Sequence, residues 1–165
     1  MIPRASAHVK RYHTVPTIGQ QTVAEHSFHV AMLCLEIQKI NNKECSAELL
    51  KAALFHDLPE HKTGDVPATA KWGSPGLKTL LDSLEDDVIT EYGLEVALTI
   101  EETLILKYAD SLELVMYCID QMNLGNKNAQ LIASRGLVFA NTLPYNTGAR
   151  QLLATIQGEY DVSSK

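Results

Sequence analysis

The chain has 165 residues, of which 45% are hydrophobic and 21% are charged, and its formal net charge is −6. This length fits one domain with a single core, and the composition is typical of a globular protein rather than a disordered or membrane-embedded one. The negative charge argues against a nucleic-acid polymer as partner, since proteins that bind the phosphate backbone usually carry a basic surface, but it leaves a small anionic substrate open.

No segment of the sequence predicts membrane targeting. No window approaches 18 continuous apolar residues, and residues 1–10 lack an apolar region, which argues against a transmembrane span and a signal peptide. The three cysteines have no C-x-x-C spacing and predict reduced thiols: Cys34, Cys45 and Cys118. We therefore expect a cytoplasmic protein without a membrane partner.

The first helical pattern begins at a capping box formed by Thr22 and Glu25. The Thr22 hydroxyl can accept the amide hydrogen of Glu25, while the Glu25 carboxylate accepts that of Thr22. The helix that follows has an apolar stripe at helical spacing, made up of Val30, Leu33 and Ile37. His26 belongs to this stripe and is expected to point toward the core.

A second helix is expected from Ser46, with Pro59 ending it. His56 and Asp57 therefore lie at or near its last turn. The polar stretch from residue 57 to residue 72 contains two prolines and a glycine, and it predicts an active-site loop or a short turn of helix.

Helical patterns continue along the rest of the chain. Ser74 and Pro75 predict an N-cap and first residue of a helix ending at Gly93, and a second capping box at residues 99–102 opens a very apolar helix over about 100–122. Further helices are expected from residue 126 or 128 to about 140, and from residue 147 to a polar tail at about 159. The fold class is all-α, and residues 1–165 form a compact bundle of six to seven helices in one domain.

Two histidines and two aspartates stand in the order H…HD…D: His26, His56, Asp57 and Asp110. Such an N₂O₂ set can bind one divalent cation and suits manganese, cobalt, iron, zinc or magnesium better than copper(I). Taken singly, His26 fits a core histidine, His56 and Asp57 a helix end, and Asp110 a buried salt bridge. Asp110 lies in the middle of an apolar helix, where an unpaired carboxylate is costly, and jointly the four favour a metal site.

The chain resembles the HD-domain phosphohydrolases. The resemblance covers most of the sequence and is carried by TVAEHS around His26, ALFHDLPEHKTGDVP around His56 and Asp57, and LKYAD ending at Asp110. Within that superfamily the chain is most similar to bacterial 5′-deoxynucleotidases (YfbR-like) and to short phage relatives, which include dATP triphosphohydrolases. If a phage encodes the chain, the expected compartment is the host cytoplasm.

The resemblance implies roles for nine residues. Four match the metal ligands: His26, His56, Asp57 and Asp110. Glu60 matches the catalytic glutamate that positions or deprotonates the attacking water, and Asp65 matches a second acid beside the substrate or a second cation. Arg11 and Lys71 match phosphate-binding residues. Tyr12 stands where relatives often have tryptophan, and it is a candidate contact to base or sugar.

The resemblance also implies the reaction and the partners. The expected cofactor is one divalent transition metal, with cobalt, manganese, zinc, iron and nickel as candidates, and a second, substrate-bound ion such as magnesium stays open. The expected substrate is a deoxynucleotide, with a lean toward hydrolysis of a dATP-like triphosphate to nucleoside and tripolyphosphate. The alternatives are a 5′-deoxynucleotidase acting on monophosphates and a non-catalytic module that binds metal or nucleotide. A homo-oligomer, dimer or larger, is also expected.

Overall fold

The computed structural model describes residues 4–164, except for the side chains of residues 68, 69 and 72. Within this range the structure is all-α, as predicted, and its elements follow each other as η1 (Arg4–His8), α1 (Val23–Ile40), α2 (Ala47–Phe55), α3 (Glu60–Thr63), α4 (Ala68–Gly73), α5 (Pro75–Glu91), α6 (Ile100–Asn123), α7 (Ala129–Thr142) and α8 (Thr147–Ser163). The six longer helices match the predicted bundle, while α3 and α4 are short helices within the polar stretch.

Local sequence signals determine where the helices begin. Thr22 accepts the amide hydrogen of Glu25 at the start of α1, with the Glu25 carboxylate bonded to the Thr22 amide in return. A second complete capping box begins α6 at residues 99–102. These bonds satisfy amide groups that the first turn leaves without helical partners.

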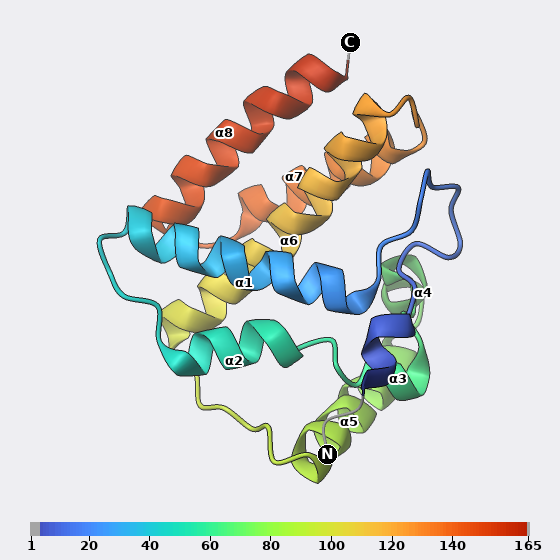
Figure 1. The fold of residues 1–165 in the computed structure, drawn as a ribbon, viewed down its shortest axis with the longest axis vertical. Helices are drawn as coiled ribbons and strands as arrows, with labels where there is room; N and C mark the ends of the chain where they lie inside the picture. The colour runs from blue at the N-terminus through green and yellow to red at the C-terminus, as the bar shows by residue number, and fades with distance from the viewer. Residues whose placement is uncertain (1–3, 165) are drawn as a thin grey trace.

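The core lies where α1 and α6 meet, with α2, α7 and α8 packed around them (Figure 1). The first turns of α1 lie toward the end of the molecule that also holds η1, α3, α4 and α5 (Figure 1). There η1 contacts both α1 and α3. An isolated antiparallel bridge between Lys10 and Thr22 closes the segment that joins η1 to α1. Segments distant in sequence therefore meet beside the start of α1.

The start of α8 packs closely against the end of α1. The amide of Gly148 donates to Asn41 Oδ1 at 2.7 Å, and a Cβ atom built at Gly148 would collide with the carbonyl oxygen of Ile37. Only glycine, which lacks Cβ, permits this approach of the two backbones.

The last helix is longer than predicted. The prediction that the helix gives way to a polar tail at about residue 159 is wrong, because α8 continues to Ser163 and includes Gly158. Leu153 and Ile156 are buried, and Tyr160 packs against the core at the next helical position. The apolar stripe thus crosses the glycine and maintains the helix.

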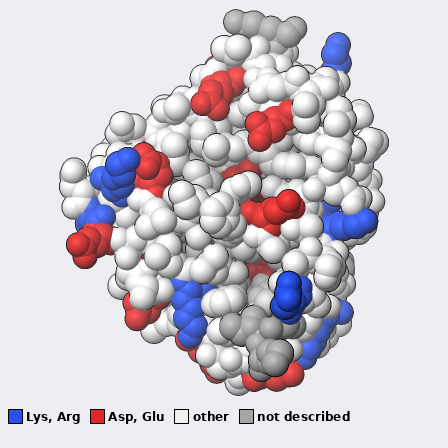
Figure 2. Space-filling model, in the orientation of Figure 1, with Lys and Arg blue, Asp and Glu red and all other residues white. Residues whose placement is uncertain are grey.

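Charged residues of both signs are interspersed on the face shown in Figure 2. Among the described residues, no helix combines the length and apolar character needed to cross a bilayer.

Candidate metal centre

Three helices supply the predicted metal ligands. His26 lies in the first turns of α1 and is fully buried, as its place on the apolar stripe predicts. His56 is the C-cap of α2, and Asp57 follows it directly. Asp110 lies in the middle of α6. Residues separated by as many as 84 positions in the chain (110 − 26) therefore reach one place.

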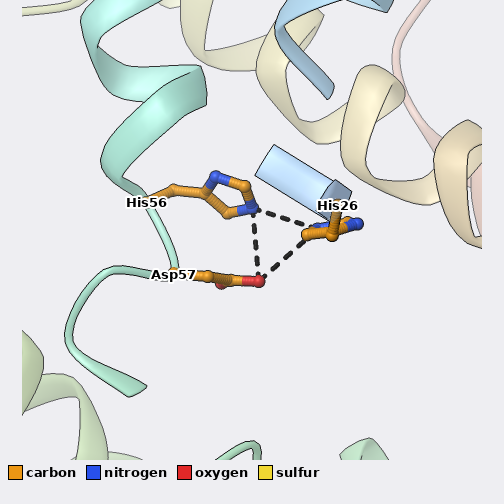
Figure 3. A group of neighbouring side chains, drawn as sticks. All are labelled: His26, His56 and Asp57. Carbon is orange, nitrogen blue, oxygen red and sulfur yellow. Dashed lines mark hydrogen bonds and ion pairs between the residues drawn. The ribbon is translucent and has the colours of Figure 1, made fainter. Parts of the chain in front are cut away.

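The donor atoms of His26, His56 and Asp57 form a small triangle (Figure 3). His26 Nε2 lies 3.3 Å from His56 Nε2 and 3.4 Å from Asp57 Oδ2. The third side, from His56 Nε2 to Asp57 Oδ2, measures 3.5 Å. All three atoms point toward one another (Figure 3).

These separations match one face of a metal coordination tetrahedron. Donor atoms bound at about 2.0–2.1 Å to one tetrahedral ion lie roughly 3.3–3.4 Å apart. Asp110 falls outside the triangle, but its Oδ1 atom lies 3.2 Å from His26 Nε2. The cluster thus offers a triangular face and a further carboxylate, and the fit to a first-row divalent ion is close.

Backbone and side-chain acceptors orient both imidazole rings. His56 Nδ1 donates to the carbonyl oxygen of Ala53 at 2.9 Å, and His26 Nδ1 donates to the carboxylate of Glu113. Because these acceptors bind a proton on Nδ1, Nε2 is the nitrogen left in each ring to bind a cation.

Acidic and basic side chains shift each other's pKa within the cluster. Although burial lowers the pKa of an imidazole, hydrogen bonds to Asp110 and Glu113 outweigh that effect and raise the pKa of His26 to about 9. Burial raises the pKa of the Asp110 carboxyl, but the hydrogen bond from His26 and the charges of His56 and Arg11 hold it below its usual range. Carboxylates and basic groups thus pair within the cluster, and a divalent cation there would interact with the same carboxylates.

Glu60 is a buried carboxylate beside this cluster. It begins α3, its side chain is almost inaccessible, and its Oε2 atom has no hydrogen-bond partner. Burial and the charges of Asp57 and Asp65 raise its pKa to about 9, while Arg11 and Lys71 oppose the increase. Buried carboxylates without partners are rare in stable structures, which makes Glu60 a candidate for a role in the chemistry.

Arg11 reaches the cluster from the segment between η1 and α1. Its Nη1 atom lies 2.9 Å from Asp57 Oδ2, the oxygen that faces both histidines. Asp65 Oδ2 accepts the amide hydrogen of Tyr12, whose φ of 58° is in the left-handed region. Asp65 therefore stabilises the turn that presents Arg11. The sequence did not predict this contact between Asp65 and the Tyr12 amide.

Tyr12 faces the protein interior on at least one side. Its ring stacks on Tyr117 with centroids 4.8 Å apart, and its hydroxyl is buried without a partner. Lys71, on α4, lies close enough to Glu60 for its charge to act on that carboxyl. Contact of Tyr12 or Lys71 with substrate stays a prediction.

Residues 4–137 match the family described as 5′-deoxynucleotidase YfbR-like. The chain belongs to the YfbR-like family. The predicted membership of the HD-domain phosphohydrolases is thereby confirmed, and with it the class of metal-dependent hydrolases.

Two kinds of curated relative are similar to this YfbR-like chain. The dATP triphosphohydrolase of Cyanophage S-2L is 31% identical over 115 residues, which are 68% of this chain and 65% of the relative. A 5′-deoxynucleotidase of Photorhabdus laumondii is 27% identical over 147 residues, or 77% of this chain and 75% of the relative. The chain thus spans slightly less than two thirds of the phage enzyme and three quarters of the bacterial one.

Solved structures share the fold. The Cyanophage S-2L HD phosphohydrolase bound to dA and one catalytic Zn²⁺ ion matches with a TM-score of 0.72 and 24% identity over 96% of this chain and 94% of that one. An HD-domain phosphohydrolase of Listeria innocua gives a TM-score of 0.77 and 19% identity over 96% of this chain and 87% of that one. At these identities the likeness establishes the fold.

Glu113 and Gln21 are two residues of the site for which the sequence predicts no role. The structure places Glu113 against His26 and places Gln21 Nε2 at 2.6 Å from Glu113 Oε1. Helical spacing brings both Glu113 and Leu114 to the side of Asp110, so spacing alone does not distinguish them. In this YfbR-like chain, the sequence signal that could have identified Glu113 as the partner of His26 is its position, three residues after the candidate ligand Asp110 in an apolar helix.

Proposed function

We propose that the chain is a divalent-metal-dependent phosphohydrolase of deoxynucleotides. The observation that carries the proposal is the triangle of His26, His56 and Asp57, with sides of 3.3–3.5 Å, in a YfbR-like chain. These residues and Asp110 would hold the ion. The metal itself is left open, and the Zn²⁺ ion of the phage structure makes zinc a candidate.

Each neighbouring residue has a chemical task in this proposal. A bound divalent ion would supply Lewis-acid chemistry to a phosphoryl oxygen and to water. Glu60 would position the attacking water and accept or relay its proton, because its buried carboxyl has an oxygen without a hydrogen-bond partner. Arg11 and Lys71 would neutralise phosphate charge, with the forked guanidinium adding orientation.

Arg11 would connect substrate and cation. Its contact with Asp57 Oδ2 brings the guanidinium to the edge of the donor cluster. A phosphoryl oxygen directed at the ion would come within hydrogen-bond reach of the same side chain. Asp65 would act mainly by supporting the turn at Tyr12, as its bond to the Tyr12 amide favours, and a further role as second acid stays a prediction.

For the substrate we favour a deoxynucleoside triphosphate, cleaved to the deoxynucleoside and tripolyphosphate. The similarity to the Cyanophage S-2L dATP triphosphohydrolase supports this choice. The second candidate is a 5′-deoxynucleotidase that releases phosphate from monophosphates, which the family description and the bacterial relatives support. Formation of a homo-oligomer is also a prediction.

A product assay separates these activities. The purified chain would be incubated with each dNTP and dNMP in the presence of Co²⁺, Mn²⁺, Zn²⁺ or Mg²⁺, and products would be resolved by anion-exchange chromatography. Tripolyphosphate with deoxynucleoside supports the first activity, and phosphate from dNMP supports the second. Nucleotide binding without turnover under every metal would contradict catalysis and favour the non-catalytic alternative.

A further inference from the structure

Glu113 is a charged side chain buried in the core side of α6. Its side chain is only 4% exposed, and it lies three residues after Asp110, on the same side of the helix. A buried carboxylate is costly unless it is bonded. Here both oxygens are used: Oε2 accepts from His26 Nδ1, and Oε1 accepts from Gln21 Nε2 at 2.6 Å.

Gln21 fixes the position of the Glu113 carboxylate. Gln21 is itself buried, and its backbone carbonyl accepts the amide hydrogen of Arg11 at 2.9 Å next to the bridge between Lys10 and Thr22. These backbone contacts therefore fix the position from which the Gln21 side chain reaches Glu113. With Oε1 bound to Gln21, Oε2 is directed at the His26 ring.

The orientation of His26 decides which nitrogen can bind a cation. A neutral imidazole carries one proton, and an acceptor beside Nδ1 keeps that proton on Nδ1 and leaves the Nε2 lone pair free. Nε2 is the atom that lies 3.3 Å from His56 Nε2 and 3.2 Å from Asp110 Oδ1. Without an acceptor at Nδ1, only the contacts of Nε2 would restrain the ring, and no bond would keep the proton on Nδ1.

We propose that Glu113 is a positioning residue for the metal site: it holds His26 with Nε2 toward the cation and increases the electron density of that ligand. The inference rests on the proposed metal centre. It adds a residue that touches neither metal nor substrate and acts through His26. Acceptors of this kind commonly change metal affinity by roughly 10- to 100-fold.

Two substitutions test the role of the carboxylate. Glu113→Ala removes the acceptor and should weaken Zn²⁺ and Co²⁺ binding by roughly 10- to 100-fold. Glu113→Gln keeps one acceptor oxygen without the charge. Because Gln21 Oε1 has no partner, rotation of the Gln21 amide can receive the new NH₂ group, so this variant should bind metal with an affinity between wild type and Glu113→Ala.

Affinity would be measured by competition with a chromophoric chelator, without nucleotide. The second readout is the His26 Nδ1–H resonance of the Zn²⁺-loaded protein in ¹H–¹⁵N NMR. This proton should appear far downfield in wild type, move upfield in Glu113→Gln, and vanish by exchange in Glu113→Ala. The visible spectrum of the Co²⁺-loaded protein should change in parallel.

Glu102→Ala is the matched control. Glu102 is a carboxylate of the same helix that bonds to Thr99 and Ser46 at the first turn, far from His26 in the chain. Its loss should lower stability while metal affinity and the His26 resonance stay at wild-type values. A stability effect alone therefore cannot imitate the expected result.

Wild-type metal affinity with an unchanged His26 resonance in Glu113→Ala would overturn the proposal. If Glu113→Ala does not fold, the Glu113→Gln variant provides the test. Wild-type metal affinity together with an unshifted His26 resonance in Glu113→Gln would also overturn the proposal. If the wild-type chain binds metal but hydrolyses no nucleotide, the proposed function fails, and the role of Glu113 in metal binding can still be tested. If a Glu113 variant is active and binds metal as the wild type does, the role of Glu113 fails and the proposed function stands.

Discussion

Asp110 is the predicted ligand whose assignment depends most on a single contact, that of Oδ1 with His26 Nε2 at 3.2 Å. Asp110→Ala removes one of two carboxylates from the cluster. It should weaken metal binding by more than roughly 100-fold, beyond the effect expected for a residue that only orients a ligand. Metal content after desalting, measured by inductively coupled plasma mass spectrometry, checks this.

Asp120→Ala is the matched control for that substitution. Asp120 is an exposed aspartate on the same helix, so its variant should keep the full metal content. Equal metal content in the two variants would remove Asp110 from the set of ligands.

Glu60 combines burial with an unpartnered oxygen. Glu60→Gln preserves its size but removes the base, so the variant should bind metal normally and lose roughly 10²- to 10⁴-fold in kcat, the usual contribution of a general base. Steady-state rates and metal content would be measured on the same preparation. Turnover at the wild-type rate would exclude Glu60 from the mechanism.

At the scale of the helices, the contact between α1 and α8 makes a prediction about stability. Gly148→Ala would place a methyl group against the Ile37 carbonyl and 2.9 Å from Asn41 Oδ1, and it should lower the free energy of unfolding by about 1–3 kcal/mol. The matched control is Gly158→Ala in the same helix, where no atom lies within 4 Å of the new Cβ. That change should stabilise by about 0.5–1 kcal/mol. Urea denaturation would contradict the packing argument if both changes were neutral.

The helices themselves were largely predictable because their signals are local. The Thr22 and Thr99 capping boxes each lie within four residues, and both form as expected. The end of α8 was not predictable in the same way. Gly158 and the polar residues after it resemble a helix end, and only packing of Tyr160 against distant segments shows that the helix continues.

For the molecule as a whole, metal binding should couple to folding. An ion that binds the four-residue cluster in the folded chain stabilises that state, by about 2.7 kcal/mol when free metal is at 100 times Kd. Thermal melts with and without Zn²⁺ should therefore show a higher Tm in the presence of metal, which a chelator reverses. The Asp110→Ala variant should show little shift, and an equal shift in both proteins would place the ion elsewhere.

The site was predictable only in part, because some of its contacts join residues far apart in the sequence. The H…HD…D order and the resemblance indicated four ligands, and His26, His56 and Asp57 do meet. The contacts that organise them join residues far apart in sequence: Arg11 with Asp57, and Glu113 with His26. The pair of Glu113 and His26 depends on how α1 crosses α6, and the pair of Arg11 and Asp57 depends on how the segment before α1 lies against the end of α2. No local pattern in the chain specifies either arrangement.

The bridge between Lys10 and Thr22 also offers a way to observe motion at the site. The amides of Arg11 and Val23 donate across it to Gln21 and Val9, at 2.9 and 3.0 Å. Local opening of a short segment such as this one requires less free energy than global unfolding. Hydrogen exchange at these two amides would therefore report when the segment that carries Arg11 lifts away from the cluster, and a bound nucleotide that contacts Arg11 should slow that exchange.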